Sequence, residues 1–324
     1  MGLLDFLLRR DLRRGARAPS LLRRLAEREG GGARISGAAD EERALGERLA
    51  AELHAYGTRE PPGLGRRGAA IASAARRRRA DELAEALAGL QPWELPALLE
   101  ALRRRPDVDL RALAATAVAL AESAVELQPL ALALGLLGLA PATEHLPLFE
   151  QAARSPALAA VCALAAEPLG VEALLRLARV ADGIGRAMLL ERLGLAAADD
   201  PGKLAPLAGE ALRLAGAVAD EPARAYAAVP LLEIADVPAL LAADPGLAEP
   251  VAACLEGAAR GGWNGGPGPG LGRLPGAIRA AEALLQSAAP LEVRQRGARA
   301  VLASHPLPPG PSRRLALELA GDEG

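Results

Sequence analysis

Aromatic residues are nearly absent from this sequence of 324 residues, which contains two Phe, two Tyr and two Trp, or 2% in all. A single large globular core usually contains more aromatic and β-branched side chains than this. Hydrophobic residues still make up 51% of the chain, which excludes a disordered protein. Most of them are Ala and Leu, which favour helices. The composition therefore predicts an all-α protein with a thin core of small aliphatic side chains.

Residues typical of catalytic and metal sites are also scarce. Cys162 and Cys254 lie far apart in apolar runs, where cysteine behaves as a small hydrophobic residue. The histidines, His54, His145 and His305, have no metal-binding spacing. The latter two precede prolines at predicted turns, so we expect both to be solvated. No nucleophile elbow occurs either. We therefore expect no catalytic residue, metal, cofactor or small-molecule substrate, and a protein that is not an enzyme.

Long hydrophobic runs are missing as well. The longest, residues 130–140, is too short to cross a bilayer. Residues 1–10 do not resemble a secretory signal, because Asp5 interrupts the apolar stretch and the arginines follow it. We therefore expect a cytoplasmic protein. Lys203 is the single lysine among 38 basic residues, and such a preference for arginine is typical of a GC-rich bacterial genome.

The charges divide the chain into two parts. Residues 1–80 contain 18 Arg and 10 acidic residues, which gives +8, and the remainder carries −10, for a total of −2. This asymmetry predicts a basic, less regular helical N-terminal region over residues 1–80 and a helical repeat domain over residues 81–324. The basic region could bind an anionic partner or pack against the acidic remainder.

Short helices are predicted within this basic region. Ser20 is a candidate cap for a helix beginning at Leu21, and a longer helix is expected at about residues 40–56. A further helix ends in an arginine run, and positive charges at a helix C-terminus interact favourably with the helix dipole. The same run is a candidate partner-binding site, formed by Arg76, Arg77, Arg78 and Arg79.

From residue 91 onward the pattern is one of paired amphipathic helices. Apolar residues recur at helical spacing in residues 95–102 and again in residues 110–117, separated by a turn at residues 106–109. One such pair cannot bury its apolar faces alone, so neighbours of the same kind are expected. A recurring Pro, apolar, Glu element supports repetition: Pro96 and Glu100, Pro147 and Glu150, Pro206 and Glu210, Pro230 and Glu233. These patterns predict a solenoid of stacked antiparallel helix pairs.

Residues 95–120 resemble the HEAT repeat. A first helix contains Pro96, the turn contains Asp107, and the second helix opens with an apolar residue and Arg111. Residues 290–303 resemble a second helix, with Arg294 in the arginine position. The resemblance covers about residues 91–320 and implies a curved stack whose inner surface holds partner proteins. It also implies that Arg111 and Arg294 pair with turn acids, and that the repeat-bracing residues are Pro96, Asp107, Arg111, Pro147, Pro206, Pro230 and Arg294.

Two further segments carry unusual residues. Residues 261–276 contain eleven Gly or Pro and lack both the phosphate-loop and the dinucleotide-binding patterns, so they are interpreted as an insertion between repeats. Trp263 either anchors this insertion on adjacent helices or, with Asn264, belongs to a partner-binding loop. Around residue 183, a helix start carries charges that are expected on an exposed face: Asp182, Arg186, Glu191 and Arg192.

The sequence thus favours a noncatalytic protein–protein interaction scaffold whose partner protein is unknown. Two alternatives remain open at this point. Arginines in residues 9–24 and 66–79 could bind nucleic acid, as in DNA glycosylases with a HEAT-like fold. Residues 1–14 could instead associate with an anionic membrane, inserting Leu3, Leu4, Phe6, Leu7 and Leu8.

Overall fold

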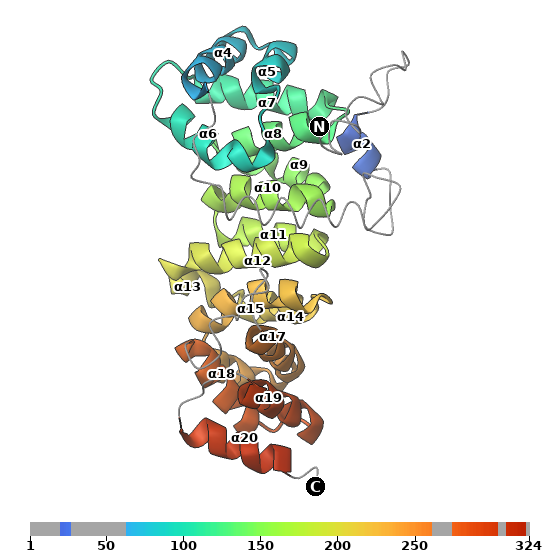
Figure 1. Ribbon diagram of the computed structural model, residues 1–324, viewed down its shortest axis with the longest axis vertical. Coiled ribbons are helices and arrows are strands. Elements are labelled where there is room, and N and C mark those ends of the chain that lie inside the picture. Colours follow the sequence, from blue (N-terminus) through green and yellow to red (C-terminus); the bar gives the residue numbers. More distant parts are fainter. Residues whose placement is uncertain (1–19, 27–62, 261–273, 304–308, 322–324) are drawn as a thin grey trace. The chain divides into compact units, whose positions relative to one another are not determined.

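The computed structural model describes residues 20–26, 63–260, 274–303 and 309–321. These residues form eighteen α-helices and four short 3-10 helices, and no strand occurs among them (Figure 1). The all-α prediction is confirmed. The Ala- and Leu-rich composition accounts for it, because these residues have the strongest helix preferences among the apolar amino acids.

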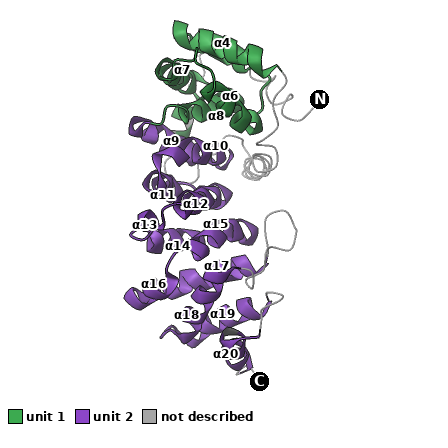
Figure 2. Cartoon of the chain, turned by 90° about the vertical axis from the view of Figure 1, so that its left-hand side faces the viewer, with its two compact units in different colours: residues 1–37, 52–141 green, residues 38–51, 142–324 purple. Residues whose placement is uncertain are grey.

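The described chain divides into two compact units (Figure 2). Unit 1 contains the described residues up to Pro141, and unit 2 contains those from Ala142 onward. The boundary that the charge distribution predicts after residue 80 falls inside unit 1. It falls in the first turn of α5 (Ala80–Leu87), which packs against α4 (Leu64–Arg77).

Unit 1 is organised around α7 (Leu110–Ser123), which contacts α2, α4, α5 and α8. Asp109 caps α7, because its side chain accepts hydrogen bonds from the backbone N–H groups of Arg111 and Ala112, both at 3.0 Å. The predicted cap at Ser20 is also confirmed, since its Oγ accepts a hydrogen bond from Arg23 at 3.3 Å. The other elements of the unit are α2 (Leu21–Ala26), η1 (Pro92–Glu94), α6 (Leu95–Arg103) and α8 (Leu127–Leu137).

Unit 2 is an array of helix pairs. Helices α10, α12, α15, α17 and α19 form one row in which each helix packs against the next, and α20 extends it (Figure 2). On their other side, α9 contacts α11, α11 contacts α14, and α16 contacts α18. The elements are η2 (Thr143–His145), α9 (Leu146–Ala153), α10 (Pro156–Ala166), η3 (Glu167–Leu169), α11 (Val171–Val180), α12 (Gly183–Ala198), α13 (Pro201–Leu204), α14 (Ala208–Gly216), α15 (Glu221–Ile234), α16 (Val237–Ala243), η4 (Pro245–Leu247), α17 (Ala248–Arg260), α18 (Pro275–Gln286), α19 (Leu291–Ala303) and α20 (Pro311–Gly321).

Small residues let the helices of this row approach closely. A methyl group at Gly185 of α12 would lie 2.6 Å from the Cβ of Ala159 in α10. A methyl group at Gly194, about two and a half turns further along α12, would lie 2.6 Å from the Cβ of Pro230 in α15. Such distances are too short for carbon atoms in contact, so these positions require glycine. The shortage of aromatic residues therefore matches the way in which the array packs.

The prolines of the recurring Pro, apolar, Glu element occupy three different structural positions. Pro96 and Pro147 lie in the first turn of α6 and α9, where the missing N–H is not needed. Pro206 lies in the turn before α14. Pro230 lies inside α15, against Gly194. The element therefore does not mark one equivalent proline position along the array.

Several buried residues bear on the functional alternatives. The expectation that His145 is solvated is wrong: it is 8% exposed, because it lies at the end of η2, directly before α9, and its ring lies edge-on to Phe149 at 6.4 Å. His54 and His305 lie outside the described residues. Cys162 and Cys254 are buried free thiols, and burial raises both pKa values, that of Cys254 to about 12.

Among the described residues, no single helix is long and apolar enough to cross a membrane. The pair α15 and α16 reaches the required length only when taken together, and the two helices are bent by 91°.

Candidate partner-binding surface in unit 1

The predicted arginine run forms the corner between α4 and α5, which we call the arginine corner and define as Arg76, Arg77, Arg78 and Arg79. All four residues are exposed. Arg78 adopts a left-handed conformation with φ 53°, and its N–H donates to the carbonyl of Ala75 at 3.0 Å. The N–H of Arg79 donates to the carbonyl of Ala74 at 3.1 Å. This pattern ends many helices, but glycine usually occupies the left-handed position.

We therefore expect Arg78→Gly to stabilise the protein by about 1 kcal/mol, because glycine adopts the left-handed conformation without steric cost. The free energy of unfolding, measured by urea denaturation at pH 7, tests this. Arg77→Gly is the matched control and should have the opposite sign, since it places glycine inside α4. Destabilisation of the same size by both variants would contradict the strained conformation.

Two of the four arginines are engaged in local ion pairs. Arg79 donates two hydrogen bonds to the carboxylate of Asp81, at 3.0 and 2.7 Å, and these lower the pKa of Asp81 to about 2. Arg77 lies 3.6 Å from Glu82. Within the described part of the chain, the guanidinium groups of Arg76 and Arg78 form no hydrogen bond or ion pair, so both are available to an acidic partner.

A shallow groove of about 280 Å³ begins next to the arginine corner, and we call it the unit 1 groove. It lies where the first turn of α5 meets the end of α7 and the start of α8. Its volume is below the 300 to 1,000 Å³ or so that is usual for small-molecule sites. An apolar side chain would fit better than a cofactor. The lining residues are Ala80, Asp81, Ala84, Leu120, Ser123, Ala124, Val125, Glu126 and Pro129.

No protein-family model, no curated protein and no solved structure matches the chain. In the residues that the structure describes, no three His, Cys, Asp or Glu side chains lie close enough together to hold a metal ion.

The arginines of unit 2 are used differently, because many of them join one helix to another. Arg176 of α11 donates two hydrogen bonds to the carboxylate of Glu150 in α9, and the longer of the two measures 3.0 Å. Arg179, also of α11, donates to Glu210 of α14 at 2.6 and 2.8 Å.

Arg213 of α14 continues this series by pairing with Asp244 at the start of η4. The pairs Arg179–Glu210 and Arg213–Asp244 each span 31 residues. The two pairs therefore have the same sequence separation, and in each an arginine is joined to a carboxylate that follows it in the chain.

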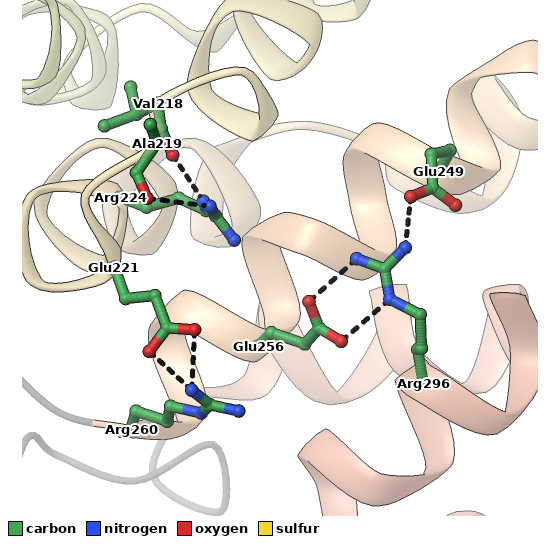
Figure 3. A network of polar contacts seen from close by, with 8 residues as sticks. All are labelled: Val218, Ala219, Glu221, Arg224, Glu249, Glu256, Arg260 and Arg296. Carbon is green, nitrogen blue, oxygen red and sulfur yellow. Dashed lines mark hydrogen bonds and ion pairs between the residues drawn. The ribbon is translucent and has the colours of Figure 1, made fainter. Parts of the chain in front are cut away.

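Figure 3 shows a second set of inter-helix contacts, between α15, α17 and α19. The guanidinium of Arg296 in α19 lies between two carboxylates of α17, bonding Glu256 at 2.9 and 2.8 Å and also Glu249. These bonds lower the pKa of Glu256 and raise that of Arg296. Arg260 of α17 pairs with Glu221 of α15 at 2.5 Å. These five side chains are therefore committed to holding helices together.

The structure places the residues implied by the HEAT resemblance as follows. Asp107 pairs with Arg105, at 3.0 and 2.9 Å, whereas Arg111 lies exposed at the start of α7. In α19, the Nε of Arg294 is buried without a hydrogen-bond partner among the described residues, and Arg296 forms the ion pairs instead. The pairs expected for Arg111 and Arg294 are thus not formed within the described ranges.

Contacts between helices are made by the glutamates of the recurring element. In unit 2, Glu150 and Glu210 bind arginines of α11, and Glu233 accepts a hydrogen bond from the backbone N–H of Ala277 at the start of α18, at 3.1 Å. The signal for these contacts in the sequence is the glutamate of the recurring element, and not the proline that the HEAT resemblance implies as the bracing residue. Trp263, Asn264 and residues 1–14 lie outside the described residues.

Proposed function

We propose that the protein is a noncatalytic scaffold that binds a partner protein, with a HEAT-like stack in unit 2 and a partner-binding surface at the arginine corner. The observation that supports this function is the contrast in arginine pairing. Arg176, Arg179 and Arg296 are bound to carboxylates of other helices, whereas Arg76 and Arg78 are exposed without such partners among the described residues.

The helix order supports a HEAT-like stack. Successive pairs, such as α9 with α10 and α11 with α12, pack so that the second helices form a continuous row. Repeat proteins of this kind bury a thin core between neighbouring pairs and leave extended surfaces for partners. The equally spaced ion pairs agree with a repeated unit.

An acidic protein segment suits the arginine corner better than nucleic acid does. Nucleic-acid binding commonly requires several phosphate contacts and, for single strands, aromatic side chains on which bases stack. The arginine corner offers two uncommitted guanidinium groups, and its residues include no aromatic side chain. Two cations flanked by an apolar groove can bind a short acidic and apolar segment with charge-assisted hydrogen bonds.

Affinity capture from a nuclease-treated lysate tests this proposal. The double variant Arg76→Glu with Arg78→Glu should retain a discrete protein partner at least tenfold less than the wild-type chain. The matched control is Arg103→Glu with Arg104→Glu, which makes the same charge change on exposed arginines at the end of α6. This control should retain the partner.

Two results would contradict the proposal. Equal retention by both double variants would show that the arginine corner does not bind the partner. Recovery of nucleic acid alone, only without nuclease and only at low salt, would favour the nucleic-acid alternative. Circular dichroism spectra of the variants ensure that the losses do not reflect unfolding.

A further inference from the structure

We propose that one face of the helix row in unit 2 binds a protein segment in which an arginine or lysine adjoins a large apolar side chain. This face, which we call the α12–α15 face, is formed by Met188, Glu191 and Leu195 of α12 and by Tyr226 and Val229 of α15. Glu191 binds the cation, and Leu195 contacts the apolar side chain. The inference goes beyond the proposed function, because it concerns another unit and a ligand of opposite charge.

The exposed side of α12 carries an apolar residue next to a carboxylate. Met188, Glu191 and Leu195 are spaced three and four residues apart, so their side chains lie on one face of the helix. Leu195 is 49% exposed, Glu191 is half-buried and Met188 is 8% exposed. The close contacts of α12 with α10 and α15 are made through Gly185 and Gly194 instead. The neighbouring helices thus leave part of this face open to a ligand.

Helix α15 continues this face. Glu191 lies near Tyr226, since its charge contributes to the raised pKa of the Tyr226 hydroxyl. Val229 follows Tyr226 by three residues on α15, and both side chains are half-buried. Aliphatic and aromatic groups therefore flank the Glu191 carboxylate along α12 and across to α15. An ion pair in such surroundings is screened less by water than one on an open surface.

Glu191 differs from the carboxylates around it because it has no bonded cation. Glu167 accepts a hydrogen bond from Arg192 at 3.2 Å, and Glu256 accepts two from Arg296, at 2.9 and 2.8 Å. Among the described residues, Glu191 forms no hydrogen bond or ion pair, and Arg192 is the charged residue that acts on its pKa. The face therefore presents a carboxylate that a cation of another molecule can bind.

An organic cation suits this face better than a metal ion does. Magnesium and calcium ions require several oxygen ligands, whereas the face offers one carboxylate among apolar groups. A guanidinium or ammonium group can bind a single carboxylate, and the aliphatic stem of Arg or Lys packs on apolar surface. A large apolar side chain beside that residue in the same segment covers Leu195. The chemistry of the face therefore points to a basic and apolar segment of a protein.

Leaving Glu191 unpaired destabilises the free protein, and a bound cation relieves this. Burial raises the pKa of Glu191 to about 7, so that near neutral pH its carboxyl group is only partly ionised. A cation that binds beside it favours the ionised form. Perturbed carboxyl groups of this kind are concentrated at functional sites, where proteins give up stability for binding.

Binding of the full chain to immobilised synthetic heptapeptides tests the inference. Each peptide has Arg, Lys, Gln or Glu at its centre, flanked on both sides by Leu or by Ser, with Ser elsewhere. At pH 8 the wild-type chain should bind the Leu-flanked Arg and Lys peptides at least about tenfold more tightly than the Leu-flanked Gln peptide, because only a cation forms a charge-assisted bond to Glu191. Exchanging Leu for Ser should weaken binding severalfold, because less apolar surface is buried.

Two variants of the α12–α15 face, each with a matched control, show which residues are responsible. Glu191→Gln should abolish the preference for Arg over Gln, whereas Glu172→Gln, at an exposed position of α11, should keep it. Leu195→Ser should abolish the preference for flanking Leu, whereas Leu317→Ser, on α20 and 53% exposed, should keep it. Glu191→Gln is expected to be more stable than the wild type, because its side chain is neutral, so its loss of binding does not reflect unfolding.

The pH dependence of binding separates a direct contact with Glu191 from a structural role. Between pH 6 and pH 8 the ionised fraction of a carboxyl group with a pKa of about 7 rises about tenfold, so the affinity for the Leu-flanked Arg peptide should rise up to about tenfold. The other ionisable groups nearby are Arg192, its partner Glu167, and Tyr226, whose raised pKa keeps it neutral in this range. Glu191→Gln retains all three and should show no such rise.

Equal binding of the Arg and Gln peptides by the wild-type chain, or no binding above background, would overturn the inference. A preference for Arg that Glu191→Gln retains would overturn it as well. Binding of the peptides with a central Glu reports on the arginine corner instead, and the double variant Arg76→Glu with Arg78→Glu should remove it. The failure of one proposal is therefore distinguishable from the failure of the other.

Discussion

Replacing Glu191 by glutamine is expected to stabilise the protein by up to about 3 kcal/mol at pH 8 and to have little effect at pH 4. Glu191 lies half-buried in α12, and burial raises its pKa to about 7 from an ordinary value of 4.5. A difference of one pKa unit corresponds to about 1.4 kcal/mol. The neutral glutamine side chain avoids the cost of keeping a carboxylate in this position.

The folded protein binds the proton of Glu191 more tightly than the unfolded chain does. Stability from this group is therefore greatest below about pH 4.5, falls as the pH rises, and is lost once the pH passes about 7. Urea denaturation of wild type and Glu191→Gln between pH 4 and 8 should give curves that diverge across this range. Glu318→Gln, on an exposed position of α20, is the matched control and should follow the wild type. If the free energies of unfolding of wild type and Glu191→Gln changed in parallel with pH, the raised pKa of Glu191 would be contradicted.

The neighbouring residues explain why no cation offsets the cost of burying the Glu191 carboxylate. Its neighbour Arg192 lowers the pKa only in part, because the Arg192 guanidinium pairs with Glu167 of η3 at 3.2 Å. Tyr226 of α15 is close enough that Glu191 contributes to the rise in the pKa of its hydroxyl. The charged form of Glu191 is therefore left without a bonded cation among the described residues.

Replacing Arg296 by alanine is expected to lower the free energy of unfolding by about 2 kcal/mol at pH 7. The variant leaves the carboxylate of Glu256 without its partner, although only 23% of that side chain is exposed. Removing one member of a buried ion pair costs more than the pair contributes, because the remaining charge is still desolvated. Loss of the contact with Glu249 adds less, because that side chain is 57% exposed.

Urea denaturation of Arg296→Ala and of Arg279→Ala, an exposed arginine on α18, tests this expectation. Only the first variant should be strongly destabilised. Because the pKa of Glu256 is lowered in the folded protein, the stability that its pairing provides is lost as the pH falls through the folded pKa. The difference from wild type should therefore shrink below about pH 4. The double variant Arg296→Met with Glu256→Met should recover part of the loss. If Arg296→Ala lowered the free energy of unfolding by less than about 0.5 kcal/mol, Arg296 and Glu256 would form an ordinary surface ion pair, and the prediction would be wrong.

Features that depend on neighbouring residues could be predicted from the sequence. The helices at residues 95–102 and 110–117 follow from apolar residues at helical spacing, and the structure has α6 and α7 there. The cap at Ser20 and the pair between Asp182 and Arg186 at 3.1 Å are likewise local, since each joins residues three or four positions apart. Such contacts require only the geometry of one helix.

Features that depend on which helices meet could not be predicted in this way. Glu191 is expected on an exposed face, but it is half-buried in α12 and lies near Tyr226 of α15. The position of Pro230 inside α15 depends on Gly194 of another helix. Similarly, an ion pair that spans 31 residues joins separate helices, and no pattern within one helix reveals it. The arginine corner was identifiable as a basic run, but the groove beside it combines three helices.

The row of second helices in unit 2 also affects how such a protein can change in evolution. Within the row, each helix contacts the helix before it and the helix after it. A helix pair gained or lost at the free end would therefore leave the contacts of the other pairs intact. The number of helix pairs can therefore change without a change of fold. Relatives with more or fewer pairs would have arrays of different length built on the same contacts.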